Sequence, residues 1–448
     1  ILIRMRIFLL SVYFYLSNLF FDFSSPFSFE PNFFEFLTIF LAIFLINQIS
    51  ASKLILSLWA FLYFFAFCYI KFAGHIPTPA EISLFWTHKA ETFESFFALY
   101  HLFIAPFIFL CGAFLVIFAQ KPTKPNFKIF AIWLLILFFV PFNFADSSIN
   151  LLKNTAQSFS LTNRATQIKT TDTKPKYKPK YKNILVIIGE SMRHDKLSLF
   201  GANAKYSPNL ENLKDKLNSK IIYSNGTNTD VALPLFFNAT QDLDKLDGKT
   251  NLFSLAKNAN FDTHFISAQT IGYLKYITPY FGPNVNPKIL GTKNDLDLPN
   301  ELQKIDWNRS NFAVFQMMGE HSPYKFYEKR FDKFGDYENC VLQSDFVLAQ
   351  IFKFAIANNI AVLYFSDHGE LLGENDGFYG HNAFKTQVYQ VPFIWTNFKE
   401  GEFASSQNDI AQILITLFGY EKVPNLAKTI KVNGSMITGE DGFREFKR

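Results

Sequence analysis

The sequence contains only three cysteines among 448 residues. Cys68 and Cys111 lie in hydrophobic runs, and Cys340 stands alone in the second half of the chain. Three cysteines in these positions cannot form a disulfide framework or a cysteine-based metal site. Disulfide-rich secreted scaffolds and zinc-finger proteins are therefore excluded, and the cysteines do not identify the compartment.

The sequence also lacks the short motifs of several common enzyme classes. It has no Walker loop, no GxSxG elbow and no HExxH pair. Those patterns carry the phosphate cradle of P-loop NTPases, the nucleophile of α/β-hydrolases and the zinc ligands of many metalloproteases. Any enzymatic activity must therefore rest on a different set of residues.

Charged residues are scarce, at 18% of the chain, whereas 49% of the residues are hydrophobic and 57 are Phe. Phe crowds into the first 145 residues, where charge is sparse. A chain of this length exceeds one ordinary core, so two or more domains are expected. We predict a transmembrane domain over residues 1–145, a linker over 146–182 and a soluble domain over 183–448.

The first domain contains several stretches close to the length of a transmembrane helix, which needs about 20 mostly apolar residues. Lys and Arg collect before the first stretch and in the second and fourth loops, which indicates that these segments are cytoplasmic. Five spans from a cytoplasmic N-terminus put everything after residue 145 outside the cytoplasm. The predicted spans are 7–22, 33–49, 54–73, 95–119 and 127–145.

The linker is predicted to contain an amphipathic helix and to end in the basic segment KPKYKPKYK, which cannot form a core. A basic run of this kind can bind nucleic acid. Its place directly after a hydrophobic segment instead favours a solvated linker beside an anionic membrane surface. We therefore expect contact with membrane lipids and no nucleic-acid partner.

The loop between the third and fourth predicted spans is long and polar and ends in THKAETFE. Glu91 and Glu94 are three residues apart, so a helix would place both on one face, with His88 about one turn earlier. Taken alone, the pattern favours a solvated helix at the membrane interface. The alternative is a polar clamp for a lipid head group.

Beyond residue 182, apolar runs alternate with helical patterns. Uninterrupted apolar runs of this length are typical of central strands that are buried on both faces. The alternation predicts an α/β domain with a largely parallel central sheet flanked by helices. The predicted strands cover residues 183–191, 261–269, 311–321 and 361–370, and the helical patterns include 207–217 and 337–359.

Acids and histidines collect where three of these runs end. Glu190 ends the first run, His321 ends the run over 311–321, and Asp367 and His368 lie near the end of the last one. Ligands of parallel sheets bind beyond the carboxyl ends of the strands. One such residue alone would be a cap or a satisfied polar group, but several that converge supply the oxygen and nitrogen ligands that suit zinc.

The segment GTNTDVALPLFFN, residues 226–238, marks the start of another helix. Thr229 or Asp230 would cap this helix, which is a purely structural role. Alternatively, the Thr229 hydroxyl lies in the positive potential of the helix N-terminus beside backbone N–H groups, an environment that suits a phosphate.

Together these features resemble the membrane phosphoethanolamine transferases of Gram-negative bacteria, which belong to the alkaline phosphatase/sulfatase superfamily. The resemblance covers nearly the whole chain, from five spans and a linker to a strand ending in GES, then GTxTxxxxP, MGxH, SDHGE and a downstream GH. It implies a zinc-dependent enzyme that moves phosphoethanolamine from phosphatidylethanolamine to an envelope acceptor. The family includes lipid A modifiers and polymyxin-resistance enzymes.

The resemblance carries roles over to single residues. Thr229 looks like the nucleophile, and His321 and His381 look like histidines that contact phosphate or a second metal. The zinc ligands that it implies are Glu190, Thr229, Asp367 and His368.

Other positions match the family less closely. The loop with His88, Glu91 and Glu94 resembles a segment that helps to bind lipid, although His88 stands where Asn is expected. Gln269 occupies the region after a strand where the family often has a basic residue, and it is included among the substrate-binding candidates. The best-known lipid A transferases flank the nucleophile with disulfide-bonded cysteines, whereas Asn225 and Leu235 stand here.

The resemblance further implies a monomer in the bacterial inner membrane with its catalytic domain in the periplasm. The acceptor stays open between lipid A, lipooligosaccharide core, another glycan and a protein. One alternative is a glycerol-phosphate transferase of the same superfamily. The other is a non-catalytic membrane sensor or scaffold, which the intact Thr229 and Asp367–His368 disfavour.

Overall fold

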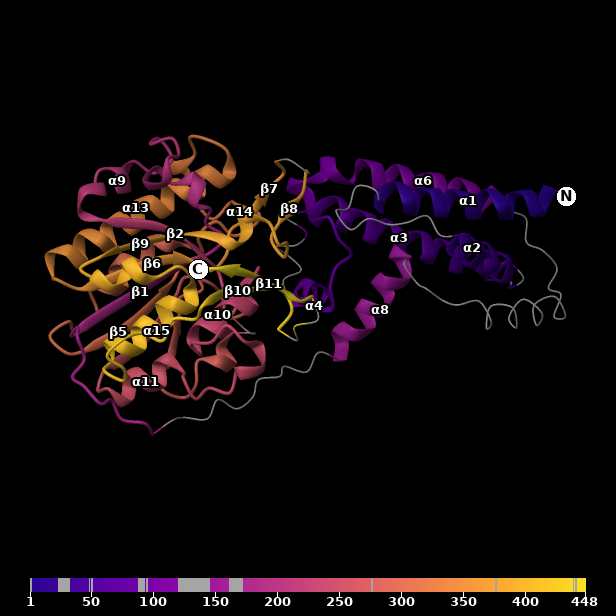
Figure 1. Cartoon of the computed structure of the whole chain (residues 1–448). Coiled ribbons are helices and arrows are strands. Elements are labelled where there is room, and N and C mark those ends of the chain that lie inside the picture. The colour runs from indigo at the N-terminus through magenta and orange to yellow at the C-terminus, as the bar shows by residue number, and fades with distance from the viewer. Residues whose placement is uncertain are drawn as a thin grey trace. The chain divides into compact units, whose positions relative to one another are not determined.

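The structure is a computed structural model, and the chain divides into two compact units (Figure 1). The first contains residues 1–162 and 372–379, and the second contains residues 163–371 and 380–448. The residues that the structure describes are 2–22, 33–47, 49, 51–87, 93, 96–119, 146–160, 172–274, 277–374, 377–437, 439 and 441–448.

The first unit is helical. Among its described residues, Ser52–Ala73 and Tyr100–Ala119 are long and apolar enough to cross a membrane, whereas Met5–Phe21 and Phe36–Ile46 are shorter apolar helices. The fifth predicted span, 127–145, lies outside the described residues, so five spans stay a prediction. The helices are α1 (Leu2–Asp22), α2 (Phe33–Ile46), α3 (Ser52–Ala73), α4 (Pro79–Thr87), η1 (Tyr100–Phe103), α6 (Ile104–Ala119) and α8 (Ser147–Ser160).

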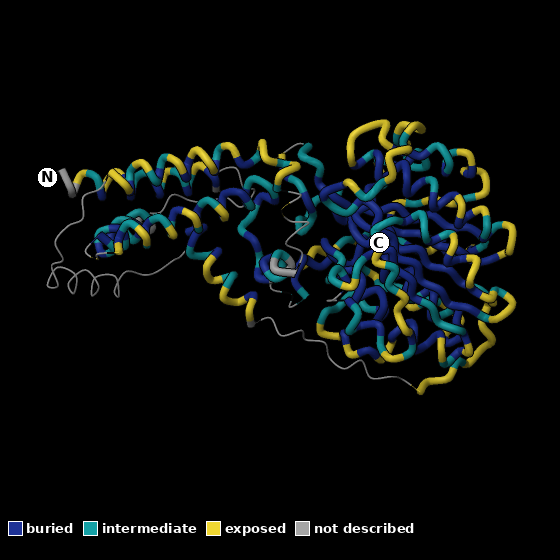
Figure 2. The backbone as a smooth tube through the Cα atoms, turned by 180° about the vertical axis from the view of Figure 1, so that it is seen from behind, coloured by how far each residue is buried: buried dark blue, intermediate teal, exposed yellow. Residues whose placement is uncertain are grey.

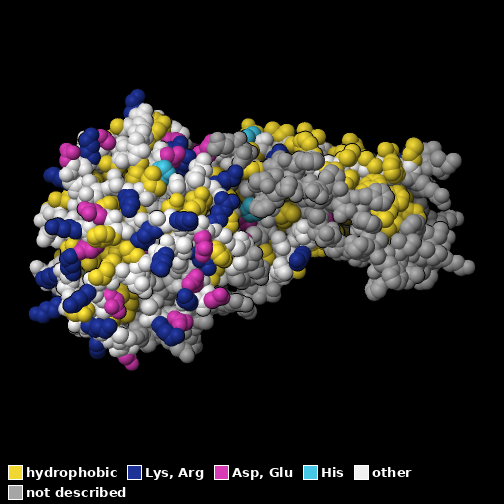
Figure 3. Space-filling model, in the orientation of Figure 1, with side chains coloured by type: hydrophobic (Ala, Val, Ile, Leu, Met, Phe, Trp, Pro, Cys, Tyr) yellow, Lys and Arg dark blue, Asp and Glu magenta, His cyan; other side chains and the backbone are white. Residues whose placement is uncertain are grey.

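Helix α3 is apolar on its outer face as well as its inner one. It buries Tyr63 and Phe67 in the core of the unit and exposes a stripe of large apolar side chains along the helix. Figure 3 shows hydrophobic side chains gathered over the helical unit. A helix that is apolar all round is expected where lipid replaces water. The exposed stripe consists of Leu54, Leu58, Phe61 and Phe65.

Helix α8, predicted as part of the linker, packs within the first unit. Asp146 precedes it and accepts hydrogen bonds from Tyr63 of α3 and from the backbone N–H groups of Ser148 and Ile149. Trp59 of α3 donates to the Ser148 hydroxyl at 2.7 Å. The division between the units falls after residue 162, inside the predicted linker.

A seven-stranded sheet forms the centre of the second unit, with strand order β2-β9-β6-β1-β5-β3-β4. Strand β1 pairs in parallel with β5 and β6, β3 pairs in parallel with β4 and β5, and β9 runs antiparallel to both of its neighbours. The sheet is therefore mixed, with a parallel core. The strands are β1 (Asn183–Gly189), β2 (Asn218–Tyr223), β3 (Asp262–Ser267), β4 (Pro287–Ile289), β5 (Asn311–Gln316), β6 (Ala361–Ser366) and β9 (Gln390–Thr396).

Helices cover both faces of this sheet (Figure 1). Apolar side chains of α10 (Thr229–Phe237), α11 (Leu252–Asn258) and α15 (Gln407–Leu417) join alternate residues of β1, such as Val186 and Ile188, in one buried cluster. Helix α13 (Asp336–Ala357) packs against β6 and β9 on the other face. The buried core follows the strands, as Figure 2 shows.

Two helical predictions have different outcomes. The pattern at 337–359 forms α13, which is also long and apolar enough to span a membrane but is mostly buried within the second unit. The pattern at 207–217 forms only α9 (Pro208–Glu211) and a 3₁₀ turn, because β2 begins directly afterwards. The remaining elements are α12 (Leu298–Leu302), α14 (Thr386–Tyr389), β7 (Leu371–Leu372), β8 (Tyr379–Gly380), β10 (Thr429–Asn433) and β11 (Phe443–Lys447).

The basic end of the predicted linker is bound along the second unit. The backbone N–H groups of Lys176 and Tyr177 donate to the Gly419 carbonyl, and that of Lys180 donates to the Leu417 carbonyl, each at 2.9 Å. Tyr181 packs against the large apolar cluster. We call residues 172–182 the strap.

We expect the strap to contribute to the stability of the second unit. A protein that begins at residue 183 loses these three backbone hydrogen bonds, a fourth from the Asn311 N–H to the Lys182 carbonyl, and the packing of Tyr181, at a cost of about 2–4 kcal/mol. A protein of residues 172–448 keeps these contacts. Urea denaturation of the two proteins measures the difference, and equal midpoints would show that the strap contributes nothing.

Candidate functional site

The parallel core of the sheet brings the predicted site residues to one edge. Glu190 follows β1, Asp367 and His368 follow β6, and Gln269 lies two residues beyond β3. Because β6, β1, β5 and β3 are successive neighbours, their carboxyl ends lie side by side. The side chains come from three separate segments of the chain, and the sheet brings these segments together.

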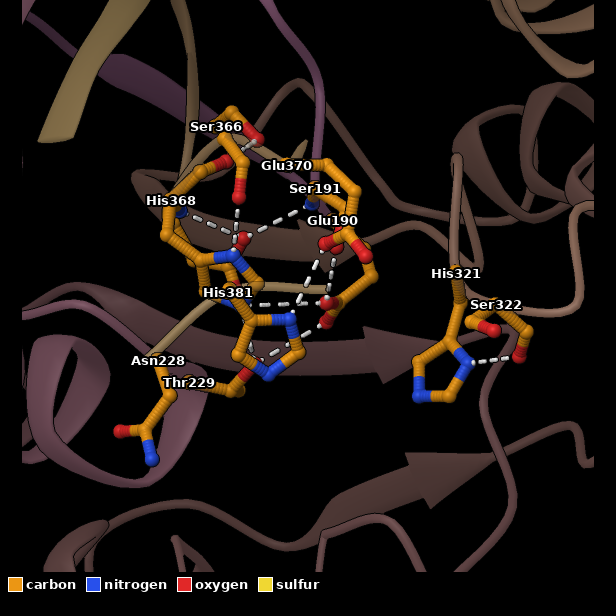
Figure 4. Close-up of polar contacts among 12 residues, drawn as sticks. Glu190, Ser191, Asn228, Thr229, His321, Ser322, Ser366, His368, Glu370 and His381 are labelled. Carbon is orange, nitrogen blue, oxygen red and sulfur yellow. Dashed lines mark hydrogen bonds and ion pairs between the residues drawn. The ribbon is translucent and has the colours of Figure 1, made fainter. Parts of the chain in front are cut away.

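The Thr229 hydroxyl lies at the centre of this cluster (Figure 4). Its Oγ1 donates to Asp367 Oδ2 at 2.6 Å and lies 3.2 Å from both Glu190 Oε2 and His368 Nε2. His368 Nε2 is also 3.3 Å from Glu190 Oε1. Glu190, Asp367 and His368 are at least 98% buried, whereas Thr229 is half-buried.

Asn228, and not Thr229 or Asp230, caps α10. Its side-chain oxygen accepts a hydrogen bond from the Val231 N–H at 3.1 Å, and Thr229 is the first residue of the helix. The prediction that Thr229 or Asp230 caps the helix is therefore wrong. Because Asn228 satisfies the helix end, the Thr229 hydroxyl is left to face the acids.

The backbone after Glu190 is held in an unusual conformation. Ser191 has φ +58°, in the left-handed region that residues other than glycine rarely adopt. This conformation points its N–H at Asp367 Oδ1, at 3.1 Å, and its hydroxyl at Glu190 Oε1, also at 3.1 Å. The Tyr337 hydroxyl fixes the turn by donating to the Ser191 carbonyl at 2.8 Å.

The turn after β5 packs tightly on the same segment. Gly319 has φ +54°, and a Cβ at this position would lie 2.7 Å from the Glu190 carbonyl oxygen. The Glu320 N–H donates to that oxygen at 3.0 Å. Only glycine allows this approach of the two backbones, which explains the glycine of the MGxH motif.

The electrostatics of the cluster favour a bound cation. Burial and the negative charge of Glu190 raise the pKa of Asp367 to about 7. Burial alone would lower the pKa of His368, but Asp367 and Glu190 raise it to about 10. Burial and the Glu190 charge also raise the pKa of Asp230 to about 7. Buried carboxylates so close together need positive charge, and His368 is the cation among them.

The donor set fits a zinc ion. One ligand atom from each of Glu190, Asp367 and His368 lies within 4.8 Å of the others. His368 Nδ1 contacts the Gly369 carbonyl at 2.8 Å, which fixes the ring so that Nε2 faces the acids. Two carboxylates and one imidazole, with a hydroxyl beside them, match the ligand types of zinc enzymes.

Two other predicted residues differ in how close they lie to this cluster. Gln269 is 99% buried and donates to Glu190 Oε2 and to the Met317 carbonyl, both at 3.1 Å. His321 stands apart from the Thr229 cluster in Figure 4, with its Nδ1 on the Ser322 carbonyl. The pKa of Glu190 is held low against burial chiefly by its contact with His368, with a smaller contribution from His321.

His381 lies against the cluster through a second pair. Its ring centroid is 4.2 Å from that of His368, and its Nδ1 is 3.0 Å from Glu370 Oε2. Glu370 is 99% buried. The predicted loop residues His88, Glu91 and Glu94 lie outside the described residues.

Sequence reasoning missed a residue that ties the segment before Thr229 to the segment that carries Asp367 and His368. Gln407, at the start of α15, is fully buried. Its amide nitrogen donates to the carbonyls of Ser366 and Asp367, and its oxygen accepts from the Asn225 N–H at 2.8 Å. A single glutamine outside any motif cannot be recognised as part of a functional site from one sequence.

The fold and the site define an α/β protein with a threonine beside a buried carboxylate–imidazole cluster at the carboxyl edge of its sheet. The family model described as sulfatase matches residues 182–420, which is more than half of the chain. The chain belongs to the sulfatase family.

Individual relatives agree with this assignment. The phosphoethanolamine transferase OpgE of Escherichia coli K12 is 25% identical over 391 residues, covering 73% of this chain and 72% of OpgE. The phosphatidylethanolamine transferase Mcr-1 of Escherichia coli is 27% identical over 269 residues, covering 49% of each chain. For most of the curated relatives, the matched part of this chain spans about half of the relative's length. These names confirm the family resemblance seen in the sequence.

The whole fold also has a solved counterpart. The integral membrane lipooligosaccharide phosphoethanolamine transferase A, EptA, from Neisseria meningitidis superposes with a TM-score of 0.66 at 16% identity. The match covers 93% of this chain and 95% of EptA. It shows that the fold, a helical membrane unit joined to a sulfatase-like unit, is shared.

Proposed function

We propose that this protein is a zinc-dependent phosphoethanolamine transferase of the bacterial inner membrane. It takes phosphoethanolamine from phosphatidylethanolamine and passes it to an envelope acceptor such as lipid A, lipooligosaccharide core, another glycan or a protein. The names of OpgE and Mcr-1 and the fold of EptA support this class of reaction. The apolar helices of the first unit support a membrane location, and the distribution of Lys and Arg between its loops favours a catalytic unit in the periplasm.

The position of Thr229 is the observation that carries the proposal. A threonine hydroxyl is a weak nucleophile at neutral pH. Here its Oγ1 donates to Asp367 Oδ2 at 2.6 Å, at the N-terminus of α10, where backbone N–H groups favour an anion. Zinc held by Glu190, Asp367 and His368 would lower the pKa of a neighbouring hydroxyl and neutralise charge on phosphoryl oxygens.

The reaction proceeds in two displacements. Thr229 Oγ1 forms a bond to phosphorus, its proton passes to Asp367, and the bond from phosphorus to the diacylglycerol oxygen breaks. The diacylglycerol oxygen takes a proton from a group at the rim, where His381 lies. The acceptor oxygen then forms a bond to phosphorus and gives its proton to the rim group, the Thr229–phosphorus bond breaks, and Thr229 Oγ1 takes back the proton from Asp367, which restores the enzyme.

Two experiments test the proposal, one on the purified full chain in detergent and one on cells. The first incubates the protein with phosphatidylethanolamine or with phosphatidylglycerol, without an acceptor, and looks for a phospho-adduct on the peptide that carries Thr229 by mass spectrometry. The second compares envelope glycolipids from cells with and without the protein. A phosphoethanolamine adduct and a phosphoethanolamine-modified glycolipid are expected.

The choice of donor separates the proposal from its alternatives. A glycerol-phosphate adduct formed from phosphatidylglycerol alone would replace the proposal with a glycerol-phosphate transferase. The absence of an adduct with either lipid, together with unchanged envelope lipids, would favour a sensor or scaffold.

A further inference from the structure

Left-handed backbone conformations cluster around the site. Ser191, Tyr324 and Asn382 have φ of +58°, +63° and +66°, and each adjoins or contacts a residue of the site. Such conformations are unfavourable for residues with a side chain and persist where the surroundings fix them, often at functional sites. Ser191 follows Glu190, and its N–H and hydroxyl donate directly to the candidate metal ligands Asp367 and Glu190. Tyr324 has a large ring, so its conformation calls for an explanation.

The Tyr324 side chain donates a hydrogen bond to Glu370, the carboxylate that also contacts His381. Its hydroxyl donates to Glu370 Oε1 at 2.8 Å, while Glu370 Oε2 lies 3.0 Å from His381 Nδ1. Tyr324 is 92% buried and Glu370 is 99% buried. The three side chains form a continuous chain of hydrogen bonds that ends beside His368, with Glu370 and His381 both visible in Figure 4.

This chain determines which nitrogen of His381 carries hydrogen. An ionised carboxylate only accepts hydrogen bonds, so the nitrogen that faces Glu370 must be the donor. Nδ1 therefore keeps its proton throughout, and Nε2 is the nitrogen that can give a proton to the substrate or take one from it. With its other oxygen occupied by Tyr324, the Glu370 carboxylate has one orientation, and the His381 ring follows it.

We infer that Tyr324 is a positioning residue, which acts through Glu370 to fix the orientation and tautomer of His381 for proton transfer or phosphate contact. This inference rests on the proposed function. Tyr324 does not reach the Thr229 cluster itself, since its hydroxyl is used on Glu370. Its left-handed backbone is what allows the ring to reach that carboxylate from the segment after β5.

A double-mutant cycle tests the inference in the full chain. Tyr324→Phe removes one hydroxyl and is expected to lower kcat for phosphoethanolamine transfer about ten- to a hundredfold, with KM within about twofold of wild type and zinc content unchanged. His381→Ala breaks the chain at its other end. In the His381→Ala protein, Tyr324→Phe should cause no further loss, because residues that act through one another are not additive.

Tyr364→Phe is the matched control. Tyr364 is a fully buried tyrosine of β6 whose hydroxyl has no hydrogen-bond partner among the described residues. Its loss should leave kcat unchanged. If the loss of any buried tyrosine hydroxyl slowed the enzyme, kcat would fall equally in Tyr324→Phe and Tyr364→Phe.

A spectroscopic readout separates this inference from the proposed function. Long-range ¹H–¹⁵N NMR of protein labelled with ¹⁵N at its eight histidines should show His381, assigned with His381→Ala, protonated on Nδ1 and mixed in Tyr324→Phe. If the wild type transfers no phosphoethanolamine, the proposed function fails. The NMR measurement still shows whether Tyr324 and Glu370 determine the tautomer of His381. An unchanged His381 tautomer in Tyr324→Phe, or equal losses of kcat in both backgrounds, would overturn the inference.

Discussion

Replacement of Thr229 by Ala is expected to reduce phosphoethanolamine transfer by about a thousandfold or more, because the variant has no oxygen to form the covalent intermediate. The hydroxyl lies between 2.6 and 3.2 Å from Asp367, Glu190 and His368, and no other described hydroxyl contacts all three. Transfer is measured with phosphatidylethanolamine as donor and a purified envelope glycolipid as acceptor.

Two further variants show whether the loss reflects chemistry. Thr229→Ser keeps the hydroxyl and should retain part of the rate, whereas Thr227→Val removes a buried hydroxyl two residues earlier that has no hydrogen-bond partner among the described residues and should retain nearly all of it. Zinc content should survive Thr229→Ala, since Glu190, Asp367 and His368 remain. Transfer by Thr229→Ala at near wild-type rate would rule out the covalent route.

Replacement of His368 by Ala is expected to remove the zinc and, with it, activity. His368 supplies the only imidazole of the three-residue ligand group, and its Nε2 lies 3.3 Å from Glu190 Oε1 and 3.5 Å from Asp367 Oδ2. Metal analysis should find about one zinc per wild-type chain and almost none in the variant. His264→Ala is the matched control, because His264 lies in β3 and bonds to Asn311 away from the site.

Loss of the metal should also appear in thermal unfolding. A ligand at a thousand times its Kd stabilises the folded state by about 4 kcal/mol, or roughly 10 °C for a unit of this size. A chelator should therefore lower the Tm of the wild type and of His264→Ala but not that of His368→Ala. An equal response of all three proteins to the chelator would show that zinc is not bound by His368.

Protons should compete with zinc for the same atoms. In the metal-free site, burial and the Glu190 charge raise the pKa of Asp367 to about 7, and the charges of Asp367 and Glu190 raise the pKa of His368 to about 10 against the effect of burial. Both groups are therefore more fully protonated at pH 6 than at pH 8. Because zinc must displace these protons, its affinity is expected to rise over that interval.

The parallel core of the sheet could be predicted because its strands are apolar without interruption. β1 and β6 are buried on both faces, so their residues are apolar at successive positions and form continuous runs that can be recognised in the sequence. β9 was missed, since its apolar run contains Pro392, and β4 has only three residues. The mixed character of the sheet depends on β9, so it was missed too.

The candidate ligands could be predicted because strand ends of a parallel sheet converge, which makes Glu190, Asp367 and His368 neighbours in any such fold. The role of Asn228 could not, because Asn228, Thr229 and Asp230 are all good N-caps, and only coordinates show which one is used. Gln407 and Tyr324 act through contacts between distant segments, which carry no local pattern.

Helix α13 raises a problem for the export of the second unit. Under the proposed topology, this unit crosses the inner membrane unfolded, and a 22-residue apolar segment passing through the translocation channel can be released sideways into lipid. Asp345 lies near its middle, where a charge costs about 2.5–3.5 kcal/mol on insertion. In the folded protein the same carboxylate accepts the N–H groups of Asn209 and Leu210 at the start of α9. Asp345 thus disfavours insertion of the segment into lipid before folding, as Lys353 of the same helix does, and holds a helix end in the folded protein.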